Sequence, residues 1–253
     1  MNSALADAAF AAFMIFCRIG SCLMLVPGYS SPRIPMQFRL LLAIAVSLSL
    51  TPLLFDMTAT ALAPVAPRLR PFLLVNEVVS GGSIGLMARV ELLALQFAAT
   101  FVANAIGLAG IPGQPIDDTE ALPPLTSLLS MAAVMVLLAS GLHVEILKAL
   151  VQSYAAMPVR LGIDAGWLLD NLTRVVASSW MMALRLSGPF IVYSVIVNIA
   201  VGLASKFTPQ VSLYFASLGL VTMGGLFILF LVTPEWLGVF LDSYESWLSG
   251  RMG

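Results

Sequence analysis

Five charged residues lie inside stretches that are otherwise apolar: Arg18, Glu77, Arg89, Glu91 and Arg185. A charge near the centre of a membrane-spanning helix costs about 2.5–3.5 kcal/mol, so such residues usually pair with other protein groups. We expect Arg18 and Glu77 to be paired inside a protein assembly. For Arg89 and Glu91, snorkelling from a helix end to the membrane interface is an alternative. We predict that all five mark contacts with other subunits.

Other patterns that could support chemistry are weak. GGSIG (Gly81–Gly85) has the spacing of a serine nucleophile elbow, but that motif needs a preceding strand, and this one stands within a long apolar segment. Gly81 and Gly85 also have the G-x-x-x-G spacing that predicts helix packing. His143 is the only histidine, so it is expected to be a structural hydrogen-bonding residue. We predict no catalytic residue, no metal site and no cofactor.

The composition indicates a membrane protein. Hydrophobic residues make up 60% of the 253 residues and charged residues only 10%, against about 25% in a soluble domain. The net charge of −1 offers no basic surface to nucleic acid. Cys17 and Cys22 fit no metal or redox spacing and are expected to be packing residues. The first basic residue, Arg18, lies inside the first apolar stretch, which predicts an uncleaved helix and not a secretory signal.

Six apolar segments follow one another along the chain, with no strand periodicity. They are Ala8–Val26, Leu40–Phe55, Phe72–Ala109, Leu125–Val151, Val175–Leu203 and Val211–Val232, followed by a short amphipathic tail at Trp236–Leu248. A membrane span needs about 20 residues, so the second segment is short and the third far too long. We expect the third to bend at Gly81–Gly85 or Gly107, to tilt, or to project from the bilayer. The pattern predicts one all-α unit, a polytopic helical membrane protein with about six long apolar helices.

The loop GLAGIPGQPIDDTEALPP (Gly107–Pro124) interrupts this apolar sequence with four prolines, three glycines and three acids. Its prolines prevent either flanking helix from continuing through it. Non-helical backbone at membrane depth is tolerated only where it is buried in protein or lines an aqueous cavity. The alternative is a solvent-exposed connection whose acids are hydrated. The loop is longer than most helix–helix connections, and loops of this length are often functional.

Four stretches carry a resemblance to a known family. They are CRIGSCLMLVPGYSSPRIPMQFRLLLAIAVSLSLTPLL (Cys17–Leu54), NEVVSGGSIGLMARV (Asn76–Val90), SGLHVEILKALVQSYAAMPVRLG (Ser140–Gly162) and GLASKFTPQVSLYFASLGL (Gly202–Leu220). In order and spacing they resemble the FliR/SctT family of type III secretion export-gate proteins, and most closely its flagellar FliR members. Family members usually carry an Asp-Pro pair in the loop before the fourth segment. Here Asp117 or Asp118 takes the place of the aspartate, and the partner proline has moved.

The resemblance implies a single export-gate unit over residues 1–253, with FliP-like helices over 1–172 and a FliQ-like helical hairpin and tail over 173–253. Such a subunit would form, with FliP and FliQ, a channel for unfolded flagellar proteins, with FlhB as a further partner. FlhA and the export ATPase would act with it functionally. The implied location is the bacterial inner membrane, in the flagellar basal body, projecting toward the periplasm. The chain would help to open and close the export channel and would not catalyse a reaction.

The resemblance also implies that the loop is a plug. Gly110–Pro123 would project inward and block the resting pore, with Ile111 and Leu122 packing the constriction. The acids would face its wetted side, and two glycines would act as pivots. The predicted plug residues are Gly110, Ile111, Pro112, Gly113, Asp117, Asp118, Glu120 and Leu122.

Two other functions remain open. A homologous gate subunit of a virulence injectisome would share the fold and export effectors. A small-molecule secondary transporter would show broken helices in two related halves with ionisable groups at the midplane. The sequence has no convincing internal repeat, which makes the transporter the weaker of the two alternatives.

Overall fold

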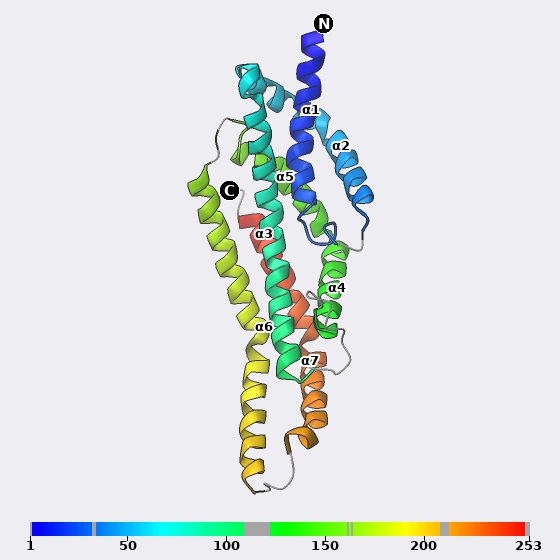
Figure 1. Cartoon of the computed structure of the whole chain (residues 1–253), viewed down its shortest axis with the longest axis vertical. Helices are drawn as coiled ribbons and strands as arrows, with labels where there is room; N and C mark the ends of the chain where they lie inside the picture. Colours follow the sequence, from blue (N-terminus) through cyan, green and yellow to red (C-terminus); the bar gives the residue numbers. More distant parts are fainter. Residues whose placement is uncertain are drawn as a thin grey trace. The chain divides into compact units, whose positions relative to one another are not determined.

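The computed structural model describes residues 2–31, 34–108, 122–160, 162, 164–207 and 213–250, and every regular element in them is helical (Figure 1). The elements are α1 (Asn2–Leu23), α2 (Met36–Leu62), the 3-10 turn η1 (Pro67–Leu69), α3 (Arg70–Ala105), α4 (Pro124–Ala139), α5 (Leu142–Ala156), α6 (Ala165–Phe207) and α7 (Leu213–Gly250). Among the described residues, five helices are long and apolar enough to cross a membrane, or six if α4 and α5 count as one span. The predicted all-α, polytopic class is confirmed.

The chain forms two compact units. The first consists of Met1–Val90, Ser140–Val176 and Tyr244–Gly253, and the second of Glu91–Ala139 and Ala177–Ser243. Helices α3, α6 and α7 therefore contribute residues to both. The division into a FliP-like part over 1–172 and a FliQ-like part over 173–253 stays a prediction.

Three helices are much longer than a bilayer is thick. Helices α3, α6 and α7 have 36, 43 and 38 residues. At 1.5 Å per residue they extend over about 54, 64 and 57 Å, against about 30 Å for the hydrocarbon core. Helix α3 runs through Gly81–Gly85 without a break.

Helix α3 ends at Ala105, and Gly107, the other expected bend, follows two residues later. Gly107 has a φ of +79°, the left-handed conformation that glycine adopts most easily. The backbone N–H of Leu108 donates to the Ala103 carbonyl at 2.8 Å, and that of Gly107 donates to the Asn104 carbonyl at 3.1 Å. These two bonds form a Schellman motif, which satisfies carbonyls that the helix end would otherwise leave open.

Other boundaries also differ from the expected segments. The segment Leu125–Val151 is divided into α4 and α5, because Gly141 has a φ of +79° just before α5 begins. Prolines end none of the helices that contain them: Pro52, Pro189 and Pro234 lie inside α2, α6 and α7. The second segment is therefore a 27-residue helix and not a short one, and the amphipathic tail continues the last apolar segment.

In the first unit, α1, α2 and α3 share a small apolar core. Buried Met14, Leu62 and Leu73 form its centre, with Phe10 packed against them. Arg70 lies at its edge, donating to Asp7 at 2.5 Å. Since these residues come from three helices, the core holds the three together at the middle of α1.

Two glycines bring α3 into backbone contact with α1. A Cβ atom added at Gly81 would lie 1.9 Å from the Arg18 carbonyl oxygen, and one at Gly85 would lie 2.5 Å from the Cys22 carbonyl oxygen. Real side chains cannot occupy such positions, so the two helices approach this closely only because both residues are glycine. Gly82, on another face of α3, would place a Cβ no nearer than 4.0 Å from Leu25.

In the second unit, α6 and α7 run side by side as an antiparallel pair (Figure 1). The Tyr193 hydroxyl on α6 donates to the Val221 carbonyl on α7 at 2.6 Å. The Trp236 indole on α7 donates to the Leu186 carbonyl on α6 at 2.9 Å. These bonds fix the register of the two helices.

The close approach of α1 and α3 predicts a position-specific effect of adding one methyl group. Gly81→Ala and Gly85→Ala should destabilise the protein by about 1–3 kcal/mol through overpacking. Gly82→Ala is the matched control, since it has room and gains up to about 1 kcal/mol of helix propensity. The measurement is the temperature at which half of the detergent-solubilised protein leaves solution. Equal midpoints for Gly81→Ala and Gly82→Ala would contradict the packing described here.

Candidate functional site

Arg18 lies at the centre of the first unit. It is on α1 and is 0% exposed, one of the largest fully buried side chains of the described residues. A buried guanidinium loses its hydration, so its N–H groups need protein acceptors. Its partners come from α3, from α5 and from the residue that follows α5.

Glu77 on α3 supplies the counter-charge and is also 0% exposed. Arg18 Nε donates to Glu77 Oε2 at 2.7 Å and Arg18 Nη2 donates to Glu77 Oε1 at 2.8 Å. Two parallel, charge-assisted bonds of this kind fix the orientation of both planar groups. Gly81 lies one helical turn after Glu77, so the close backbone contact and the ion pair form one continuous interface between α1 and α3.

The same guanidinium holds the end of α5. Arg18 Nη1 donates to the Ser153 hydroxyl at 3.2 Å, and Nη2 donates to the carbonyl of Met157, the C-cap residue, at 2.9 Å. The Tyr154 ring lies under the guanidinium, 3.9 Å from ring centroid to Cζ. A cation at a helix C-terminus is favoured because the last carbonyls carry partial negative charge. Arg18 therefore joins α1, α3 and α5.

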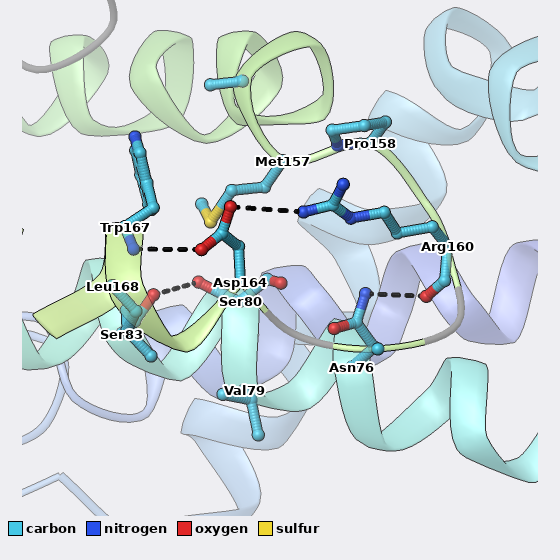
Figure 2. A pocket seen from close by; sticks show the side chains of 12 residues that line it. Asn76, Val79, Ser80, Ser83, Met157, Pro158, Arg160, Asp164, Trp167 and Leu168 are labelled. Carbon is cyan, nitrogen blue, oxygen red and sulfur yellow. Dashed lines mark hydrogen bonds and ion pairs between the residues drawn. The ribbon is translucent and has the colours of Figure 1, made fainter.

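A small pocket adjoins this interface (Figure 2). Asn76, next to Glu77, donates from its amide to the Arg160 carbonyl at 3.1 Å. Arg160 faces Asp164 at 3.7 Å, and Asp164 accepts from the backbone N–H of Trp167 at 3.1 Å, which caps the start of α6. Figure 2 shows these groups bonded to one another around the pocket. The pocket thus joins the beginning of α6 to α3 through polar contacts.

The other predicted subunit-contact charges do not join this cluster. Glu91 is 0% exposed in the second unit and accepts from the Ser243 hydroxyl at 3.1 Å. Arg89 and Arg185 are exposed. Arg89 and Glu91 lie in the middle of α3, which is longer than a bilayer is thick, so the interface-snorkelling alternative stays open for them. Contact with other subunits stays a prediction for all five.

Most of the predicted plug lies outside the described residues. Gly110, Ile111, Pro112, Gly113, Asp117, Asp118 and Glu120 fall in the range 109–121, which the structure does not describe. Leu122 is described and is exposed, just before α4 begins.

The elbow-like motif does not form a nucleophile. Ser83 lies inside α3, where its hydroxyl donates to the Ser80 carbonyl at 2.8 Å. His143 is half-buried on the first turn of α5. In the described parts of the chain, no three His, Cys, Asp or Glu residues come together as metal ligands. The arrangement around Arg18 is suited to fixing helices in place.

Sequence reasoning missed the partners of Arg18 on and after α5. Ser153 and Tyr154 lie within a stretch that carries the family resemblance, but nothing in that stretch marks them as partners of Arg18. The Met157 acceptor is a backbone carbonyl, which any residue type would provide, so no sequence pattern could reveal it. The hydrogen bond from Ser243 to Glu91 joins residues 152 positions apart, and no sequence pattern predicts it either.

Known proteins are similar to this sequence over most of its length. Residues 9–247 match the family described as "Bacterial export proteins, family 1". The flagellar biosynthetic protein FliR of Caulobacter vibrioides is 26% identical over 241 residues, or 94% of each chain. FliR of Aquifex aeolicus is 26% identical over 223 residues, covering 87% of this chain and 83% of the relative. FliR of Escherichia coli K12 is 21% identical over 227 residues, covering 88% and 84%.

The matched region includes every element from α2 to α6 in full and most of α1 and α7, with the charge cluster at Arg18 inside it. Apolar helices of spanning length agree with such a match, and together they identify a membrane protein. This chain belongs to the bacterial export proteins, family 1.

Proposed function

We propose that the chain is a core subunit of the flagellar type III protein export gate. In this role it assembles with FliP and FliQ into the channel through which unfolded flagellar proteins cross the inner membrane. FlhB is a further partner, and FlhA and the export ATPase act with the gate. The subunit lies in the flagellar basal body and projects to the periplasmic side. The chain forms and gates a passage and performs no catalysis.

One observation carries this proposal. The match to the FliR of Caulobacter vibrioides covers 94% of both chains, so no large part of either lacks a counterpart. All three relatives described above carry the name of a flagellar biosynthetic protein, which favours the flagellar role over the injectisome.

The helix dimensions support assembly with other subunits. Helices of about 54 to 64 Å exceed a single hydrocarbon core about twofold, so part of each helix needs another environment. Within an apolar 18-residue window of α6 and of α7, only 17% and 11% is buried in the chain itself. Large apolar surfaces of this kind are expected on subunits of an obligate assembly.

The geometry at Arg18 argues against a proton-coupled small-molecule transporter. A proton-relay carboxylate must be able to exchange its proton during the transport cycle. Both Glu77 oxygens are instead engaged by one guanidinium, away from solvent. We therefore assign the pair a structural role in holding α1, α3 and α5 together.

The loop Gly107–Pro124 is proposed to plug the resting channel. Support comes from its proline and glycine content and from the rule that irregular backbone at membrane depth must be buried or line a cavity. Gly110–Pro123 would then form the closure, with Gly110 and Gly113 as pivots.

Deleting the gene should abolish motility, because rod, hook and filament subunits could not leave the cell. Swimming in soft agar and filament staining measure the effect, and expression of the intact chain from a plasmid is the control. A deletion strain that still assembles filaments would exclude the flagellar role.

The structural role of the ion pair predicts non-additive substitutions. Arg18→Met or Glu77→Met alone leaves one buried charge without its partner, and each should cost about 3–5 kcal/mol. The double variant removes both charges and should be less destabilised than the sum of the two. The amount of chain recovered in the assembled complex measures stability, and export of hook protein measures function. Recovered assembly without any recovered export in the double variant would instead indicate a functional role for the charges.

Shortening the loop should make the assembled gate leak. Removal of residues 111–120 leaves both flanking helices intact, so the complex should still form. Passive entry of a small solute into cells should then rise relative to cells with the unaltered gate. If the complex assembles and the membrane stays tight, the loop is an ordinary connection.

A further inference from the structure

The end of α3 packs against the backbone of α7 in the second unit (Figure 1). Ile106, the first residue after α3, is fully buried. A Cβ atom added at Gly225 would lie 2.5 Å from the Ile106 Cβ and 2.2 Å from its Cγ2. A β-branched side chain cannot swing away from such a contact, because its rotamers are few and its Cβ is fixed by the backbone. Glycine at position 225 therefore lets Ile106 lie directly on α7.

A hydrogen bond from α7 holds the same residue. The Thr222 hydroxyl donates to the Ile106 carbonyl at 2.9 Å, across 116 positions of sequence. Carbonyls at the end of a helix have no helical N–H donor. The two backbone bonds that close α3 go to the Ala103 and Asn104 carbonyls, and the Ile106 carbonyl, beyond them, accepts from Thr222. Loss of this donor would leave a carbonyl unpaired in apolar surroundings, which is costly.

The next residue, Gly107, meets the same face of α7. A Cβ added at Gly107 would lie 2.9 Å from Leu218 Cδ1 and 3.5 Å from Thr222 Oγ1. Leu218, Thr222 and Gly225 are spaced four and three residues apart, so they lie on one face of α7. The Tyr193 hydroxyl of α6 donates to the carbonyl of the residue before Thr222 at 2.6 Å, which fixes this level of α7 to α6. The point at which the chain leaves α3 is thus fixed against α7, which is itself bonded to α6.

We propose that Leu218, Thr222 and Gly225 are positioning residues for the loop Gly107–Pro124. They fix the point and the direction in which the chain enters the loop, because they contact the residue before it and its first residue. The inference rests on the proposed role of the loop as a plug and adds the residues that direct it. A functional loop acts at a defined place only where a rigid scaffold holds its ends.

Passive entry of a small solute into cells with the assembled gate tests this role. Thr222→Val replaces the hydroxyl by a methyl group and removes the bond to Ile106. Solute entry should rise about 2-fold to 10-fold, the equilibrium shift that loss of one hydrogen bond produces, while the amount of recovered complex stays the same. Thr222→Ser keeps the donor and should leave entry unchanged. Thr233→Val is the matched control, since the Thr233 hydroxyl donates within α7, to the Leu229 carbonyl at 2.6 Å.

A combined variant separates positioning of the loop from general stability. Removal of residues 111–120 should by itself make the gate leak, and Thr222→Val should then add nothing, because the segment that Thr222 positions is gone. A contact that only stabilised the fold would raise entry equally with and without the loop. The same rise in the shortened gate, a rise for Thr233→Val, or no rise for Thr222→Val in an assembled gate would each overturn the inference.

If Thr222→Val does not assemble, Leu218→Ala decides. It removes the contact with Gly107 at a residue that is 38% exposed, and it leaves no polar group unpaired. Solute entry should rise, and unchanged entry would overturn the inference. The failure of this inference and that of the plug are distinguishable. A shortened gate that leaks beside a tight Thr222→Val gate removes only the positioning role, whereas a shortened gate that stays tight removes the plug as well.

Discussion

A guanidinium out of reach of water must have its hydrogen bonds met by protein, and this requirement at Arg18 shapes the first unit. Four bonds leave the group, two to Glu77 and one each to Ser153 and the Met157 carbonyl. Charge-assisted bonds weaken steeply when their geometry is disturbed. The positions of α3 and of the end of α5 are therefore tied to one residue of α1. The glycine contact at Gly81 permits this geometry, because a larger residue would separate the two helices that the ion pair joins.

The sequence was informative about class and about unusual residues. A charge inside an apolar run is conspicuous, so Arg18 and Glu77 could be singled out from residue types alone. Their pairing with each other was not predictable, since 59 positions separate them and Arg89 and Glu91 were equally conspicuous. Only the packing of α1 against α3 distinguishes the paired charges from the exposed Arg89.

Helix boundaries were predicted less well, and the reason is physical. Proline ends helices in water, but in apolar surroundings the unpaired carbonyl has no better alternative, so the helix continues through Pro52, Pro189 and Pro234. Conversely, the apolar sequence shows no break at Gly141, yet the left-handed backbone of this residue separates α4 from α5. The hydropathy of a residue predicts whether its surroundings are apolar, but it says little about the backbone torsion angles.

The two prolines of the α6–α7 pair have a mechanical consequence. Each leaves the carbonyl four residues earlier without its helical N–H donor. The bond from the Trp236 indole to the Leu186 carbonyl places Pro189 and Pro234 near the same level of the antiparallel pair. Both helices therefore lack a backbone hydrogen bond at one height, where bending stretches fewer bonds than it does elsewhere. Under a lateral load we expect the pair to bend at this level first, with the side chains packed around it setting the resistance.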